Sequence, residues 1–92
     1  MYLEIVSPEA TLFSGDIESI TVPGTSGSFQ VLNNHAPIVS TLEAGTVSIA
    51  GNINLEKEVE NKFQKGDGDI TLFEINSGTI ELRDNKVILL AD

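Results

Sequence analysis

Few side chains in this sequence could carry out chemistry. His35 is the only histidine and there is no cysteine, so one chain can build neither a relay of two imidazoles nor a thiolate or histidine-rich metal site. A Ser, His and Asp triad is compatible with the composition, but no G-x-S-x-G sequence marks a nucleophile. The sequence therefore predicts a protein that is not an enzyme. We expect His35 to be a loop residue that hydrogen-bonds the backbone or contacts a partner.

Two short segments share single features with ligand sites. Gly24 and Gly27 could begin a phosphate-binding loop, but the Lys-Ser or Lys-Thr pair with which a P-loop reaches nucleotide phosphates does not follow them. Asp67 and Asp69 have the spacing of two calcium ligands, but the third acidic position and the distal glutamate of an EF-hand are missing. We expect turns at both places, and neither a cofactor nor a metal.

The charge of the chain limits its partners. Fourteen acidic residues against five basic ones give a net charge of -9, and residues 1–50 contain no Lys or Arg. Nucleic acids and anionic lipids attract proteins through cationic contacts, so this balance argues against both. The acidity serves solubility or complements a basic protein partner. The sequence has no run of roughly 20 apolar residues and no secretion signal at its start, which predicts a soluble cytoplasmic protein.

Short runs rich in Val, Ile, Thr and Phe alternate with clusters of Gly, Pro, Asn and Asp, which is typical of an all-β protein. The length is that of one domain, residues 1–92. The expected strands cover residues 3–5, 10–14, 16–22, 29–32, 38–42, 46–49, 70–75, 79–83 and 86–90.

Three local patterns make sharper predictions about these strands. Asp84 and Asn85 form a two-residue turn that favours positive φ, so the strands on either side should pair as an antiparallel hairpin. Residues 87–90 are all apolar, which predicts a central strand buried on both faces. Between Leu72 and Phe73 the apolar pattern changes phase, which indicates a bulge or burial on both faces.

Residues 56–69 differ from the rest because charged side chains crowd them. Leu55, Val59 and Phe63 have the four-residue spacing of one face of a short helix. A solvated, charged β-hairpin that ends in the turn at residues 66–68 is the alternative. We favour the hairpin because strands surround this segment.

Three strings carry a family resemblance: "FSGDIESITVPGTSG", "NNHAPIVSTLEAGTVSI" and "NSGTIELRDNKVILLAD". Together they resemble the epsilon subunit of bacterial F-type ATP synthases, which is equivalent to the mitochondrial delta subunit. The resemblance covers nearly the whole chain, with residues 50–69 as the exception. It implies a flattened sandwich of two five-stranded antiparallel sheets.

The resemblance also implies a non-catalytic subunit of the rotating central stalk. Such a subunit binds the gamma subunit, rests on the polar loops of the ring of c subunits, and couples the two during proton-driven ATP synthesis. Its place is the cytoplasmic face of the bacterial plasma membrane, as a peripheral component. Carried onto this sequence, the resemblance puts Ser7, His35 and Ser40 on the gamma-facing side. The residues that it brings to the c-ring are Ser26, Gly27, Ser28, Phe29, Gln30 and Val31.

Most bacterial relatives continue past the equivalent of "LAD" into two helices that bind ATP or inhibit hydrolysis, whereas this sequence ends at Asp92. We therefore expect neither the usual epsilon inhibition nor ATP sensing. The alternative function is a free-standing ligand-binding β-sandwich. Such modules often present exposed aromatic platforms, and this sequence has four Phe, one Tyr and no Trp.

Overall fold

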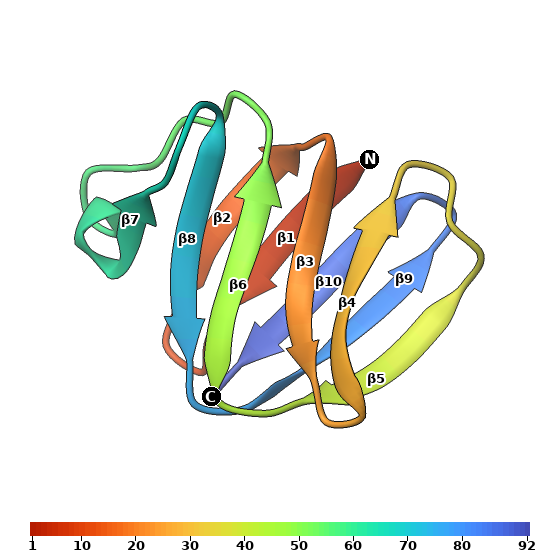
Figure 1. Cartoon of the computed structure of the whole chain (residues 1–92). Helices are drawn as coiled ribbons and strands as arrows, with labels where there is room; N and C mark the ends of the chain where they lie inside the picture. The colour runs from red at the N-terminus through yellow and green to blue at the C-terminus, as the bar shows by residue number, and fades with distance from the viewer.

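The computed structural model describes residues 1–92 and contains ten strands and one short 3-10 helix (Figure 1). No helix in it is long and apolar enough to cross a membrane. The elements are β1 (Tyr2–Val6), β2 (Thr11–Asp16), β3 (Ser19–Gly24), β4 (Gly27–Leu32), β5 (Ile38–Leu42), β6 (Gly45–Ala50), η1 (Glu60–Lys62), β7 (Phe63–Lys65), β8 (Ile70–Ile75), β9 (Gly78–Arg83) and β10 (Lys86–Ala91).

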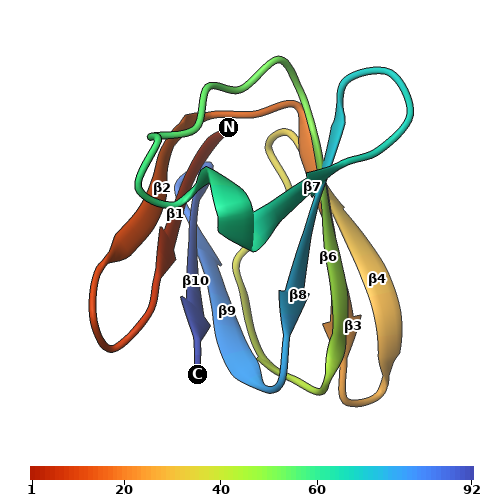
Figure 2. The same ribbon diagram turned by 90° about the vertical axis from the view of Figure 1, so that its left-hand side faces the viewer.

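The strands form two layers of five. The first has the order β2-β1-β10-β9-β5 and the second the order β4-β3-β6-β8-β7. One backbone pairing, Gly24 with Leu42, joins β3 to β5 and makes the two layers one curled sheet. Figure 2 shows β1, β2, β9 and β10 on one side and β3, β4, β6 and β8 on the other. The predicted all-β, sandwich-like class is therefore confirmed.

One pairing differs from the expected antiparallel pattern. β1 and β10 run parallel, with Leu3 opposite Val87 and Ile5 opposite Leu89, so the sheet is mixed. Parallel neighbours need a long crossover connection, and here all of the chain between β1 and β10 provides it. Because β1 and β10 are the first and last strands, no local sequence pattern reports their relative direction.

The core lies between the layers as one cluster of 19 buried apolar residues. Strands place alternate side chains on opposite faces, and the inward positions of β1 and β10 are the buried ones. Leu3, Ile5, Val87 and Leu89 are each 0% exposed. With no disulfide, the two layers are held together by this apolar packing.

β10 is central, between β1 and β9, as predicted, but it is buried on only one face. Leu90 is 49% exposed and Ile88 is half-buried. The prediction of burial on both faces is therefore wrong for this strand. The physical reason is that no other element of the chain covers the outer face of the first layer.

The phase change near Leu72 does not mark a bulge. β6 and β8 pair without a break from Gly45 opposite Ile75 to Ala50 opposite Ile70. The pattern arises because a polar residue, Thr71, occupies an inward position beside the buried Phe73, while Leu72 is half-buried on the outer face. The irregularity in the sheet lies instead in the β1–β2 pairing, next to Ile5.

The charged segment before β8 combines both predicted structures. β7 and β8 form the favoured hairpin, and the Gly66 N–H donates to Ile70 O across its turn (2.8 Å). Before β7 the chain makes a hydrogen-bonded turn at residues 57–59 and then the short 3-10 helix η1. Leu55 and Val59 are half-buried against the core, and Phe63 is buried, with its ring stacked on Phe73 (4.9 Å between centroids). Their four-residue spacing thus marks core anchors rather than a continuous helix.

Candidate functional site

A long part of the chain carries no charge, although 19 of the 92 residues are Asp, Glu, Lys or Arg. Between Glu18 and Glu43 there is none of these four residue types. Residues 19–42 form β3, β4, β5 and the loops between them, where the two layers join. We call this region the uncharged corner. The chain thus concentrates its charge elsewhere on the surface.

The uncharged corner also exposes large apolar side chains. Val39 on β5 is 80% exposed and Leu32 at the end of β4 is 54% exposed. Interfaces between proteins are depleted in charged residues at their centre, and exposed apolar groups mark them. A hollow of about 380 Å³ lies beside Val39, lined by Pro37, Ile38, Val39, Glu81, Leu82 and Arg83. Composition and shape therefore both point to a protein-binding surface.

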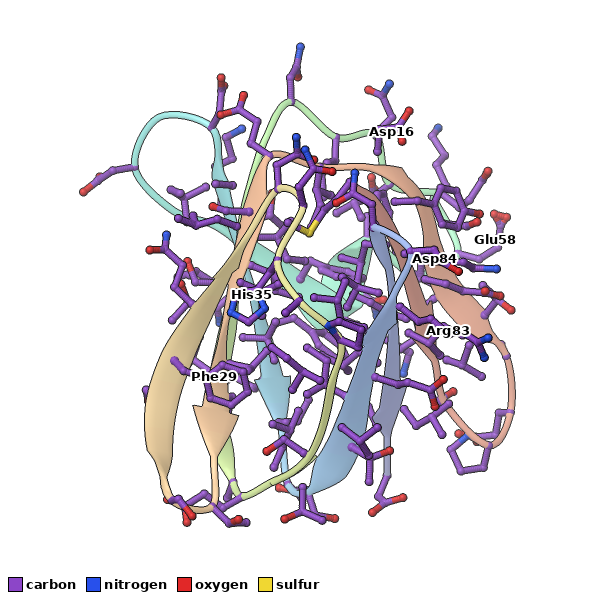
Figure 3. All side chains as sticks on the ribbon, turned by 90° about the vertical axis from the view of Figure 1, so that its right-hand side faces the viewer. Asp16, Phe29, His35, Glu58, Arg83 and Asp84 are labelled. Carbon is purple, nitrogen blue, oxygen red and sulfur yellow. The ribbon has the colours of Figure 1, made fainter.

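His35 lies in the connection between β4 and β5, and Figure 3 shows its ring and that of Phe29 between the ribbons of these strands. The His35 N–H donates to Leu32 O (3.2 Å), which closes a turn. Nδ1 of its ring lies 2.7 Å from Ala36 O. Because a carbonyl oxygen can only accept, Nδ1 is the donor in this bond. The prediction of a loop histidine that bonds the backbone is confirmed.

The three residues expected on the gamma-facing side do not lie at one place. His35 precedes β5 and Ser40 lies within it, half-buried opposite Ile80. Ser7 follows β1 and its hydroxyl donates to Ala10 O (3.2 Å). Because β10 and β9 lie between β1 and β5, Ser7 and Ser40 are separated by three strand spacings, roughly 14 Å. His35 and Ser40 both belong to the segment that leads into and forms β5, five residues apart along the chain, whereas Ser7 lies beyond two intervening strands.

The segment expected at the c-ring, residues 26–31, has an exposed and a buried part. Residues 26–28 are exposed at the turn between β3 and β4, and Gln30 is exposed on the outer face of β4. Phe29 is half-buried and packs against the core, and Val31 is 0% exposed. Side chains alternate along a strand, so the surface offered to a partner comprises residues 26–28 and Gln30.

The five cations lie outside the uncharged corner. Lys57, Lys62 and Lys65 belong to the segment between β6 and β8, and Arg83 and Lys86 flank the β9–β10 turn. Arg83 reaches the rim of the hollow beside Val39. A partner at the corner therefore meets apolar and neutral polar groups first, with Glu81, opposite Val39, and Arg83 supplying charge at the edge.

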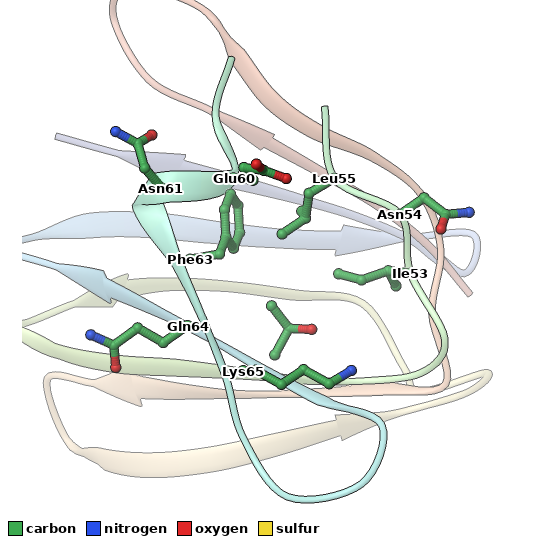
Figure 4. A pocket seen from close by; sticks show the side chains of 9 residues that line it. Ile53, Asn54, Leu55, Glu60, Asn61, Phe63, Gln64 and Lys65 are labelled. Carbon is green, nitrogen blue, oxygen red and sulfur yellow. The ribbon is translucent and has the colours of Figure 1, made fainter. Parts of the chain in front are cut away.

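A second hollow, of about 540 Å³, lies between the 53–65 segment and the β7–β8 edge (Figure 4). Neutral polar, charged and apolar groups line it: Ile53, Asn54, Leu55, Glu60, Asn61, Phe63, Gln64, Lys65 and Thr71. It contains no histidine, and no group of three or more His, Asp or Glu side chains in the chain could hold a metal ion. His35, which carries the single imidazole of the chain, lies in a different part of the molecule.

Sequence reasoning missed Leu32 and Val39 as candidate contact residues. The signal that could have found them is the absence of charge between residues 18 and 43, combined with apolar residues at positions that alternate outward. Along a strand, one alternating set of side chains faces the core and the other faces solvent. Only the folded structure shows which set faces solvent.

Comparisons with known proteins agree with the geometry. The family described as "ATP synthase, Delta/Epsilon chain, beta-sandwich domain" matches residues 1–60. The ATP synthase epsilon chain of Campylobacter concisus is 36% identical over 92 residues, which are 100% of this chain and 60% of that protein. The epsilon chain of Chlorobaculum tepidum is 38% identical over 90 residues, which are 98% of this chain and 86% of that protein.

Solved structures show the same fold at low sequence identity. A chain in the central stalk and c-ring structure of the Tetrahymena thermophila mitochondrial ATP synthase matches 99% of this chain and 62% of its own length, with a TM-score of 0.77 and 16% identity. The present chain spans about 60% of the length of its Campylobacter relatives. The extent of the family match and the identity to relatives such as that of Chlorobaculum show that this chain belongs to the ATP synthase epsilon chain family.

Proposed function

We propose that this chain is a non-catalytic subunit of the central stalk of an F-type ATP synthase, which connects the gamma subunit with the c-ring during proton-driven ATP synthesis. Within the complex it is peripheral to the cytoplasmic face of a bacterial plasma membrane. One observation supports this most directly: the segment expected to meet the c-ring and two of the three residues expected to meet gamma, His35 and Ser40, fall within the uncharged corner, residues 19–42.

β4 lies between the two proposed contacts. Its start adjoins the exposed turn at residues 26–28, which we assign to the c-ring, and its end leads into the connection that carries His35, which we assign to gamma. Six residues of strand span roughly 20 Å. Phe29 and Val31 fix this strand to the core, so it can act as a rigid spacer between the two partners.

We assign the gamma-facing side to His35 and Ser40, and we add the exposed Val39, whose side chain projects from the opposite face of β5. Ser7 also remains assigned to gamma, at a second point of contact near the β1–β2 turn. A partner that touches both places would extend across the first layer.

The coupling role belongs to the sandwich, and the inhibitory role does not. Residues 1–92 contain strands and one short turn of 3-10 helix. We propose no inhibitory or ATP-sensing role for these residues, because the family resemblance ascribes both roles to two helices that follow the sandwich. The Campylobacter relatives have further length outside the region that matches this chain.

Replacement of Val39 by Glu tests the proposal. A charge at this exposed position leaves the core intact, but it places a desolvated carboxylate in the proposed gamma contact. We expect about tenfold less gamma subunit to co-purify from native membranes, which corresponds to ~1.4 kcal/mol of binding free energy. Gln64→Glu on β7, at the far edge of the second layer, is the control and should leave recovery unchanged. Equal recovery with Val39→Glu removes this surface from the gamma interface.

The alternative function, a free-standing ligand-binding module, has less support. Phe13, Phe63 and Phe73 are buried, Phe29 is half-buried, and Tyr2 is 36% exposed, so a single aromatic side chain is exposed to solvent. The same co-purification separates the two functions, because a free-standing module would be recovered without any stalk subunit.

A further inference from the structure

Asn85 links two loops that are distant in the sequence. It is the second residue of the β9–β10 turn, and its side-chain Oδ1 accepts a hydrogen bond from the Asn34 N–H (2.8 Å). Its Nδ2 donates to Asn33 Oδ1 (2.9 Å). The side-chain amide of Asn85 thus accepts one hydrogen bond and donates another, and its two partners are consecutive residues in the connection between β4 and β5. We call residues 33–37 of this connection the His35 loop.

The residue that Asn85 holds has an unusual backbone. Asn34 has a φ of 62°, a left-handed conformation that residues other than glycine adopt infrequently. The next residue, His35, donates its N–H to Leu32 O, so the backbone of Asn34 determines where the histidine leaves the turn. All of residues 33–37 are exposed, and no apolar core orders this loop.

We propose that Asn85 is a positioning residue for partner binding: it holds Asn33 and Asn34 so that the His35 loop is ordered before a partner arrives. The proposal rests on the proposed function, because it takes the gamma subunit as that partner. Ordering a flexible loop on binding reduces affinity, since each fixed residue loses conformational entropy. A loop that the fold has already ordered avoids this loss.

The chemistry of the side chain explains why an asparagine suits this place. The linkage needs an acceptor for a backbone N–H and a donor for the Asn33 oxygen, and an amide supplies both, whereas a carboxylate only accepts. Asn85 also has a φ of 60°, which asparagine tolerates well in a two-residue hairpin turn. Glycine at the same position would keep the turn and lose both bonds.

The turn offers a matched pair of variants. Asn85→Gly removes the linkage. Asp84→Gly changes the neighbouring turn residue, which also has a positive φ (52°) but makes no bond to the His35 loop. The Asp84 carboxylate only approaches Arg83, 3.8 Å away, with both side chains largely exposed. Because glycine suits both positions, neither variant should disturb the hairpin.

Amide hydrogen exchange of the full chain without a partner tests the linkage itself. Asn33 Oδ1 also accepts a bond from the Met1 amino group (3.2 Å), so the Asn34 amide is the sharper reporter. We expect this amide to exchange about tenfold faster in Asn85→Gly than in Asp84→Gly, because its bond is lost and the loop opens locally. Equal exchange in the two variants overturns the proposal.

Titration of the full chain with the gamma subunit tests the positioning role. We expect the affinity of Asn85→Gly to fall by about fivefold to tenfold, the effect of one or slightly more net hydrogen bonds, while that of Asp84→Gly stays within twofold of the parent. Unchanged affinity despite faster exchange would show that Asn85 orders the loop for stability alone, which overturns the proposal. If the parent chain does not bind gamma, the proposed function fails as well, and the two failures are therefore distinguishable.

Discussion

Gly24 lies directly beneath the ring of Phe29. A β-carbon at Gly24 would stand 2.8 Å from ring Cε1 and 2.7 Å from Gly27 O, which is closer than such atoms pack. The close approach lets β3 and β4 turn tightly at the edge of the second layer while Phe29 covers their backbone. The exposed turn at residues 26–28 thus depends on a residue that has no side chain.

Gly24→Ala should destabilise the domain by about 1–3 kcal/mol, because the added methyl group overpacks against backbone and ring. Urea unfolding followed by circular dichroism measures this change. Ser26→Ala, in the exposed turn that follows, should stay within about 0.5 kcal/mol of the parent. A Gly24→Ala variant as stable as the parent would mean that Phe29 can move away from β3 at no cost.

Adjacent leucines in β10 should respond very differently to truncation. Leu89 is 0% exposed and Leu90 is 49% exposed. Leu89→Ala should lower the free energy of unfolding by about 2–5 kcal/mol, because it leaves a cavity between the layers. Leu90→Ala removes a side chain that is half in water, and we expect a loss below about 1 kcal/mol. Similar losses in the two variants would contradict the one-sided burial of β10.

Phe63→Ala should loosen the segment between β6 and β8 more than the rest of the domain. The Phe63 ring stacks on Phe73 and ties the short β7 to the core. Amide hydrogen exchange should accelerate across residues 53–65. If the segment opens together with the core, the free energy of unfolding should fall by about 3–5 kcal/mol. Protection in β1 and β10 serves as the internal reference. Uniform acceleration in every strand would instead indicate that this segment is no separate unit.

A matched pair of glutamines tests the proposed contact with the c-ring. Gln30 on β4 and Gln64 on β7 are both exposed, and they lie in one row of the second layer, at its opposite edges. Gln30→Trp should weaken association with the ring about tenfold through steric overlap at the interface, whereas Gln64→Trp should not. ATP-driven proton pumping relative to ATP hydrolysis, in reconstituted vesicles, measures the coupling. Equal coupling in both variants would move the ring contact away from β4.

Local sequence signals predicted the parts of the fold that depend on local geometry. Asp84 and Asn85 predicted a two-residue hairpin turn, and their φ values of 52° and 60° confirm it. The prediction that residues 87–90 are buried on both faces was wrong, because an apolar run does not show which of its side chains another layer covers. The parallel pairing of β1 with β10 lies beyond local reasoning, since it joins strands from opposite ends of the chain.

The candidate site was predictable in outline and not in detail. The family resemblance of the string around His35 indicated which segment to consider as the site. The alternation of side chains along β4 could have shown that Gln30 and Val31 face opposite sides of the strand. The distance between Ser7 and Ser40 could not be predicted, because it follows from the strand order of the first layer. The bonds of Asn85 to Asn33 and Asn34 were equally hidden, as they link positions more than 50 residues apart.

The single backbone pairing between Gly24 and Leu42 has a mechanical consequence. Apart from the loops that pass from one layer to the other, the layers touch elsewhere through side chains, which slide more readily than hydrogen-bonded strands. A force or torque applied to β4 or β5 is therefore transmitted to both layers at once. It passes through the main chain at the pairing of Gly24 with Leu42, which lies beside these two strands. A load applied at the far edge of the second layer, on β7, would have to cross the apolar core between the layers first.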